Sequence, residues 1–144
     1  MRIQKGKIRF SRKEVWNIGH VLQEIIVIGL KQFRESKRHG IPMEVYSEFE
    51  EYDGTYESTE NIDIDVASDK WEEILDHIIK YLCISGEPEY NGRWIKRKDG
   101  DVSVFGMEPD DEDWDKYIEE LKDWQENHEK ACQYLGKYIS CIWD

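Results

Sequence analysis

The sequence predicts a helix-dominated α+β fold, a three-helix bundle with one or two short β-hairpins, in a single domain over residues 1–144. Apolar residues recur at helical spacing in three long stretches, and Asn-Gly and Asp-Gly dipeptides mark turns between shorter alternating stretches. Aromatic residues make up 12% of the 144 residues, which offsets chain entropy even though 36% of the residues are charged. We therefore expect a folded chain with one core.

The first long helix follows a basic stretch of ten residues that predicts a short strand or an extended arm. Ser11 and Glu14 form a capping box at the helix start. Gly40 favours a helix C-cap and Pro42 cannot continue a helix, so the helix should end at about His39. Its predicted apolar face consists of Val15, Ile18, Leu22, Ile25, Ile26, Gly29 and Phe33.

Residues 44–69 hold ten acidic residues and no Lys or Arg. Two weak strands around Asp53-Gly54 are one interpretation, and an acidic solvated loop is the other. Ser68 then predicts the N-cap of a second helix, which Gly86 and Pro88 end. The apolar face of this helix consists of Trp71, Ile74, Leu75, Ile78, Ile79 and Leu82.

Two turn signals, Asn91-Gly92 and Asp99-Gly100, flank a basic stretch at residues 93–98 and predict a β-hairpin around Asp99-Gly100. The last helix should begin in the acidic run at 108–115, because negative charge favours a helix N-terminus. The strongest periodic signal of the chain follows: Trp114, Tyr117, Ile118, Leu121, Trp124, His128, Cys132, Leu135, Tyr138, Ile139 and Ile142. The apolar stripe from Leu135 to Trp143 either inserts into the chain's own core or forms a homodimer through the C-terminal helix.

The cysteines Cys83, Cys132 and Cys141 form an odd set without CxxC spacing, which favours reduced thiols and a cytoplasmic location. Gln23 and Glu24 interrupt the most apolar stretch, so neither a signal peptide nor a membrane-spanning segment is predicted.

Metal and catalytic motifs are weak. An EF-hand frame fits a set of side chains in the acidic segment, but Val66 stands where the frame needs Gly. That set is Asn61, Asp63, Asp65, Asp69 and Glu72. Two pairs of side chains have the residue types that bind zinc, His128 with Cys132 and His77 with Cys83. Cys and His are also ordinary residues on apolar helix faces. No phosphate loop or nucleophile motif occurs, so we predict no metal site, no cofactor and no enzymatic activity.

Basic residues gather in three islands, at residues 2–13, 31–38 and 93–98. If the islands meet in the fold, they form a pocket for an anionic, nucleotide-type ligand. The candidate residues are Arg34, Lys37, Arg38, Arg93, Lys96 and Arg97, with Tyr90 and Trp94 as stacking platforms. The alternative is that these cations interact with helix C-termini and with the acidic segments.

Three motifs resemble a known group of proteins. They are F-S-x-x-x-x-W at Phe10 to Trp16 followed by Gly-Ile-Pro at 40–42, W-E-E-I-L-D at 71–76, and Y-L-G-K-Y-I-S-C-I-W-D at 134–144. The pattern, over roughly half of the chain, resembles small acidic proteins of tailed bacteriophages. The resemblance implies a phage origin and a fold, so the expected location is the host cell cytoplasm. It implies no activity and no site residues.

The formal net charge of −12 argues against binding of duplex nucleic acid, since phosphate repels such a chain. We interpret the chain as a non-enzymatic phage accessory protein that binds and blocks a host protein, as a counter-defence inhibitor would. The alternative is a protein that sequesters a nucleotide-type signalling ligand. The residues expected to contact a basic protein partner are Glu48, Glu50, Glu51, Asp53, Glu57, Asp110, Asp111 and Glu112.

Overall fold

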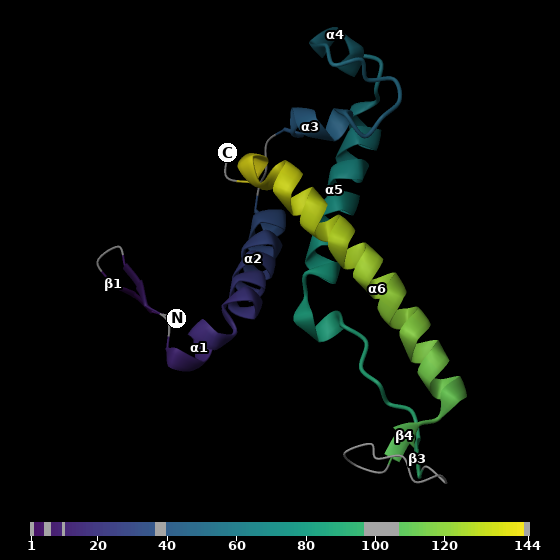
Figure 1. Cartoon of the computed structure of the whole chain (residues 1–144). Helices are drawn as coiled ribbons and strands as arrows, with labels where there is room; N and C mark the ends of the chain where they lie inside the picture. The colour runs from purple at the N-terminus through teal and green to yellow at the C-terminus, as the bar shows by residue number, and fades with distance from the viewer. Residues whose placement is uncertain (1, 5–6, 10, 37–39, 97–106, 143–144) are drawn as a thin grey trace.

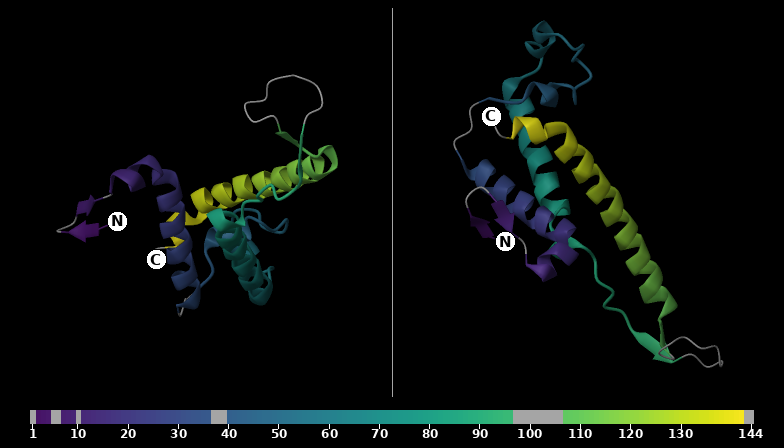
Figure 2. Two further views of the ribbon diagram at one scale, coloured as in Figure 1. Left: turned by 90° about the horizontal axis from the view of Figure 1, so that it is seen from below. Right: turned by 60° about the vertical axis from the view of Figure 1, so that its left-hand side comes forward.

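Three long helices, α2 (Ile18–Glu35), α5 (Ile64–Tyr81) and α6 (Asp111–Tyr138), form the framework of the computed structural model. The structure describes residues 2–4, 7–9, 11–36, 40–96 and 107–142. Both α2 and α6 pack on α5, and α6 crosses α5 and extends past its end (Figure 1). The prediction of a helix-dominated fold is confirmed. A three-helix bundle with hairpins is not confirmed, because α6 diverges from the other long helices instead of running beside them (Figure 2).

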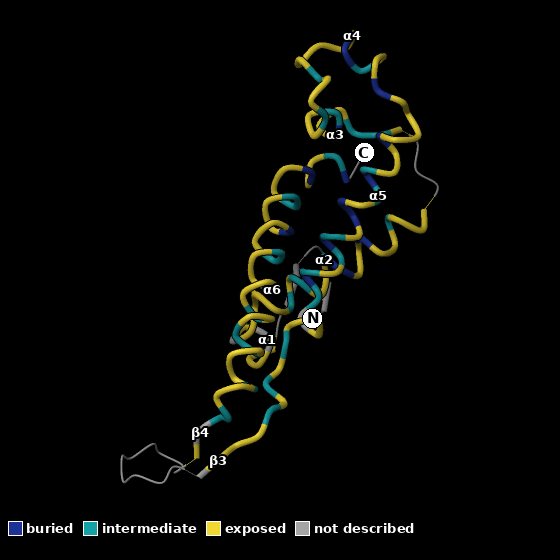
Figure 3. The backbone as a smooth tube through the Cα atoms, turned by 90° about the vertical axis from the view of Figure 1, so that its right-hand side faces the viewer, coloured by how far each residue is buried: buried dark blue, intermediate teal, exposed yellow. Residues whose placement is uncertain are grey.

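The short elements lie around these helices. They are β1 (Arg2–Gln4), β2 (Lys7–Arg9), α1 (Arg12–Trp16), α3 (Met43–Tyr46), α4 (Tyr56–Thr59), η1 (Ile84–Gly86), β3 (Trp94–Lys96), β4 (Met107–Pro109) and η2 (Ile139–Cys141). The strands form two antiparallel pairs, β1 with β2 and β3 with β4. Figure 3 shows that buried positions concentrate where α5 meets its neighbours, whereas the β3–β4 end is mostly exposed.

The register of the second hairpin differs from the prediction. A two-residue turn at Asp99-Gly100 would place Trp94 opposite Phe105, but Trp94 lies opposite Pro109. The strand within the basic stretch, β3, therefore pairs with a segment further along the chain than the one we expected. The turn itself, at residues 97–106, lies outside the described residues.

The central helix α5 begins five residues earlier than predicted. Asp63 is its N-cap and accepts a hydrogen bond from the backbone N of Asp65 at 2.8 Å, so Ser68 lies inside the helix. The predicted N-cap was wrong because Asp63 satisfies the free amides before Ser68 is reached. The helix ends at Tyr81, ahead of η1. Its buried face consists of Ala67, Trp71, Ile74, Leu75 and Ile78.

Two reciprocal hydrogen bonds join α5 and α6. His77 of α5 donates from Nε2 to the carbonyl oxygen of Asn127 at 3.0 Å, and His128 of α6 donates from Nδ1 to the carbonyl oxygen of Tyr81 at 2.6 Å. A carbonyl oxygen only accepts, so the bonded ring nitrogen carries the proton in each case. Each helix thus satisfies a half-buried imidazole of the other, which fixes where the two helices cross.

The first helix is broken at Asn17, whose φ of −116° and ψ of 36° interrupt the helical geometry, and α2 ends at Glu35 rather than near His39. The predicted core face was also partly wrong. The positions that pack toward the core are Ile26, Val27, Leu30 and Phe33. Other members of the predicted face are exposed, namely Val15, Ile18, Leu22 and Ile25.

The acidic segment forms neither a hairpin nor a simple loop. It holds the short helices α3 and α4, and Gly54 takes a φ of +93° that favours glycine. Thr55 caps α4 by accepting from the backbone N of Ser58 at 3.3 Å. We call residues 43–63 the acidic lobe. Figure 1 shows α4 projecting beyond the start of α5, so the lobe forms one end of the molecule.

One polar cluster attaches the acidic lobe to α6. The ring of Tyr138 is buried 5.3 Å from that of Trp71, and its hydroxyl donates to Glu48 Oε1 at 3.0 Å. Lys137 forms an ion pair with the same carboxylate. Burial by itself raises the pKa of Glu48, but the hydrogen bonds from Lys137 and Tyr138 and the charge of Lys137 outweigh it and hold that pKa below its usual value.

Part of the C-terminal stripe packs inside the chain, whereas Ile139 of the same stripe is 45% exposed. Tyr138 and Ile142 are buried in the same core as α5, and Leu135 packs against it. Trp143, which the sequence placed in this stripe, lies outside the described residues.

Replacement of Glu48 by Gln should lower the free energy of unfolding by about 1 kcal/mol at pH 7, since the ion pair with Lys137 is lost from a carboxylate that is only 22% exposed. The folded pKa of Glu48 is lowered, so the ionised carboxylate stabilises the fold above the unfolded value of about 4.3. This contribution disappears as the pH falls through the folded pKa. The difference between wild type and Glu48→Gln in urea unfolding should therefore shrink as the pH is lowered from 7 toward 3.

The exposed Glu50→Gln variant is the matched control and should unfold like the wild type at both pH values. A Glu48→Gln effect that is equal at pH 7 and pH 3 would contradict the assigned role of the carboxylate.

Candidate functional site

The structure does not gather the predicted anion-binding residues into one pocket. Arg34, in the last turn of α2, donates from Nε to Glu72 of α5 at 3.0 Å and also forms an ion pair with Asp76. The end of α2 and the β3–β4 hairpin lie in different parts of the molecule (Figure 1). Lys96 is in β3, and Lys37, Arg38 and Arg97 lie outside the described residues.

Tyr90, Arg93 and Trp94 do lie together, next to the start of α6. Tyr90 is the centre of an aromatic cluster, which we define as Tyr90, Trp94, Trp114 and Tyr117. The Tyr90 ring is 5.3 to 5.5 Å from the other three, in edge-to-face contacts. Its hydroxyl donates to the carbonyl oxygen of Arg93 at 2.8 Å. Burial and the nearby carboxylates of Asp113 and Asp110 raise the pKa of Tyr90, so this phenol stays neutral.

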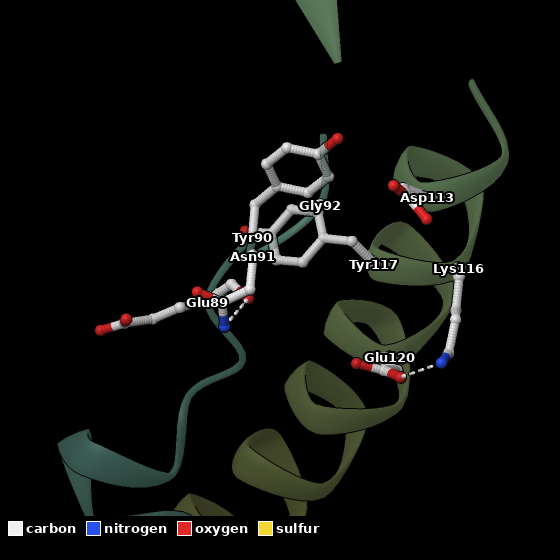
Figure 4. Close-up of a pocket in the computed structure, with 8 residues that line it drawn as sticks. All are labelled: Glu89, Tyr90, Asn91, Gly92, Asp113, Lys116, Tyr117 and Glu120. Carbon is white, nitrogen blue, oxygen red and sulfur yellow. Dashed lines mark hydrogen bonds and ion pairs between the residues drawn. The ribbon is translucent and has the colours of Figure 1, made fainter. Parts of the chain in front are cut away.

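A shallow groove of about 250 Å³ runs between the 89–92 segment and the first turns of α6. Figure 4 shows the rings of Tyr90 and Tyr117 close together, with Asp113 and Glu120 projecting from α6 beside them. The lining residues are Glu89, Tyr90, Asn91, Gly92, Asp113, Lys116, Tyr117 and Glu120.

The charge of this groove favours a cation over an anion. Three carboxylates line it against one ammonium group, and that ammonium, Lys116, lies 3.9 Å from Glu120. Asp113 accepts from the backbone N of Arg93 at 3.0 Å and lies 3.9 Å from the Arg93 guanidinium. The guanidinium is 82% exposed and so remains open to solvent. Any anion held by Arg93 and Trp94 would therefore sit outside the groove, on the hairpin side.

The predicted partner-binding carboxylates divide into two groups, one on the acidic lobe and one at the start of α6. Glu48 and Asp53 serve the fold: Asp53 accepts from the backbone N and hydroxyl of Thr55 at 2.9 and 2.6 Å, and these bonds lower its pKa. Glu50, Glu51 and Glu57 are exposed on the acidic lobe, and the structure gives them no ion-pair partner among the residues it describes.

The second group lies at the start of α6, away from the lobe (Figure 1). Asp110 is the N-cap of α6 and accepts from the backbone N of Glu112 at 3.3 Å. Asp111 and Glu112 are exposed in the first turn, where negative charge stabilises the helix. The two groups therefore present two separate acidic surfaces.

The metal-ligand patterns find little support in the geometry. Asp65, Asp69 and Glu72 lie within α5, so the EF-hand frame has no loop to occupy. Burial and the charge of Glu129 raise the pKa of Cys132, whose Sγ lies 3.8 Å from His128 Nε2. Among the residues that the structure describes, no three His, Cys, Asp or Glu side chains are grouped so as to hold a metal ion.

The sequence did not predict the exposure of several residues on these surfaces. Trp114 and Tyr117 were assigned to the core face of the last helix, but α6 extends past α5 there, so they contact Tyr90 instead. Tyr56 and Ile64 are exposed on the acidic lobe and at the start of α5, at 69% and 68%. The only signal in the sequence was an aromatic or aliphatic residue among carboxylates.

No protein-family model, no curated protein and no solved structure matches this chain. Within the described part of the chain, no helix combines the length and apolar character needed to cross a membrane.

Replacement of Gly92 by Ala should detach the 89–93 segment from α6. A Cβ at this position would lie 2.6 Å from the Tyr90 hydroxyl oxygen and 2.7 Å from Asp113 Cβ, too close for either atom. We expect a loss of about 1 to 3 kcal/mol in the free energy of unfolding and a weaker near-UV circular dichroism signal from the aromatic cluster.

Gly136→Ala is the matched control, because a Cβ there meets nothing within 4 Å. Gly136 lies inside α6, so this change should raise stability by about 0.5 to 1 kcal/mol. Equal effects of the two substitutions would show that the close approach at Gly92 is not a constraint.

Proposed function

We propose that this protein is a non-enzymatic accessory protein of phage origin that binds a basic protein of the host and blocks it in the host cytoplasm. A counter-defence inhibitor is a protein of this kind. The acidic lobe is the binding surface. The resemblance of the Trp-led first helix and the closing Lys-Tyr and Trp-Asp pattern to phage proteins supports the origin.

The observation that carries the proposal is the set of unpaired carboxylates on an ordered support. Glu50, Glu51 and Glu57 are exposed, and no cation among the described residues pairs with them. Val45, Ser58 and Ile62 are buried within the lobe, and Val45 belongs to the same core as α5, so the lobe is packed against the rest of the chain. Carboxylates held in place lose less conformational entropy on binding than carboxylates on a free loop.

The lobe also offers a suitable anchor for a protein partner. Tyr56 is exposed next to Glu57, and protein interfaces are enriched in tyrosine surrounded by a polar rim. The net charge of −12 would steer a basic partner toward this end and would repel duplex nucleic acid.

The triple variant Glu50→Gln, Glu51→Gln and Glu57→Gln tests the proposal. Its matched control is Glu119→Gln, Glu126→Gln and Glu129→Gln on the exposed side of α6, which removes the same amount of charge. When the variants are used to capture proteins from lysates of bacterial hosts, the lobe variant should bind at least about tenfold less of the basic protein than the wild type does. The control variant should bind as much as the wild type.

Added salt should weaken this capture, because the contacts are between exposed charges. Capture that is equal for both triple variants, or insensitive to salt, would count against the lobe as the binding surface.

A second candidate function rests on Arg93 and Trp94. The two side chains are adjacent in sequence, and both are exposed at the start of β3, where they could hold and stack on a nucleotide-type anion that the protein sequesters. A thermal-shift screen with mono-, di- and cyclic nucleotides tests it. At a hundredfold excess over the dissociation constant, a ligand should stabilise the fold by about 2.7 kcal/mol. The double variant Arg93→Gln and Trp94→Ala should abolish the shift, and no shift for the wild type would remove this candidate.

A further inference from the structure

The outer side of α1 and α2 carries an aliphatic stripe that no other described part of the chain covers. We call it the outer seam, and its members are 36% to 57% exposed: Val15, Ile18, Leu22, Ile25 and Ile28. On the other side of the same helix, Val27 and Leu30 are buried against α5. The apolar surface of α2 therefore extends well beyond the face that α5 covers, and an apolar helix surface of that extent is normally covered.

The spacing of the outer seam is that of a coiled-coil helix. From Ile18 the steps are four, three and four residues, through Leu22 and Ile25 to Gly29. These steps are the alternation of a and d positions in a heptad, which places them in one narrow row along the helix. A Cβ at Gly29 would meet nothing within 4 Å, so the row also has a flat point where another helix can approach closely.

We propose that the outer seam is the interface between two copies of this chain, with α2 of each copy packed antiparallel against α2 of the other. In an antiparallel pair an a position of one helix faces a d position of the other. Leu22 then faces Ile25 of the second copy, and Ile18 faces Gly29. The arrangement is symmetric about a point between Leu22 and Ile25, so a single surface serves both copies, as a two-fold interface requires.

The positions that flank the seam are compatible with self-pairing. Val21 and the seam residue Ile28 flank the row from Ile18 to Gly29, and in the same antiparallel arrangement each approaches the other across the two-fold axis. Neither carries charge, so no like charges meet at the centre of the interface. A partner recognised mainly by charge would leave these aliphatic side chains unused.

The distribution of charge along the chain also favours a second copy. Residues 1–38 hold ten basic and three acidic residues, whereas residues 39–144 hold ten basic and twenty-nine acidic residues. Figure 1 shows that α2 runs from α1 toward α3 at the base of the acidic lobe. Antiparallel packing brings α1 of each copy beside the end of α2 in the other. That end carries Lys31 and Arg34, but Arg34 is paired with Glu72 and Asp76 and the acidic lobe follows, so the basic N-terminal elements approach a region of net negative charge.

The test is the molar mass of the full chain in solution, measured by light scattering across concentrations. The wild type should be a dimer. Leu22→Glu should be a monomer, because it places a charge in the centre of the seam. Val66→Glu is the matched control: Val66 is an aliphatic residue of α5 that is 53% exposed, so it receives the same charge without touching the seam and should remain dimeric.

A milder variant distinguishes loss of the interface from loss of the fold. Ile25→Gln keeps the helix and adds no charge, and it should raise the dimer dissociation constant at least about tenfold with unchanged far-UV circular dichroism. The inference is overturned if the wild type is monomeric at all concentrations, if both seam variants remain dimeric, or if Val66→Glu dissociates as readily as Leu22→Glu. A monomer that binds anionic phosphatidylserine vesicles through the seam would also overturn it.

Discussion

The buried hydroxyl of Tyr138 is the constraint on which the arrangement of this protein depends. Its ring fills the space beside Trp71, so the hydroxyl is removed from water and must find an acceptor inside the protein. Glu48 supplies that acceptor and is itself neutralised by Lys137. A single cluster thus connects the end of α6, the centre of α5 and the acidic lobe. The lobe can hold its carboxylates in fixed places because its base is bound to the core.

The charges of the molecule have different uses, although most of them have the same sign. Arg34 forms ion pairs with Glu72 and Asp76. These pairs join α2 to α5 and occupy the guanidinium, so it does not serve a ligand site. Asp63 and Asp110 cap helices. Glu50 and Glu51 have no such structural use among the described residues, whereas Glu57 lies in the first turn of α4. Exposed ion pairs contribute little to stability, so the fold does not need these carboxylates to be paired. Unpaired carboxylates on an ordered surface therefore suggest a role in binding rather than in folding.

The packing of α5 with α6 and with α2 leaves apolar side chains exposed in two places. His77 and His128 hold the two helices together near one point, so the first part of α6 extends past α5 and carries Trp114 and Tyr117 away from the core. Tyr90 covers them only partly, and the groove results. On the other side, α5 has room for one face of α2, and the second face is left as the outer seam.

The sequence by itself determined the three long helices, because periodicity and caps are local properties. Asp110 ahead of an acidic first turn, and the spacing from Trp71 to Ile78, specify helices wherever their neighbours lie. Only the tertiary structure decided which face of α2 meets α5, which carboxylates remain unpaired, and that Arg34 lies beside Asp76. These depend on contacts between residues far apart in the chain. Periodicity shows which side chains share a face, but the packing of helices against one another decides which of two apolar faces is buried.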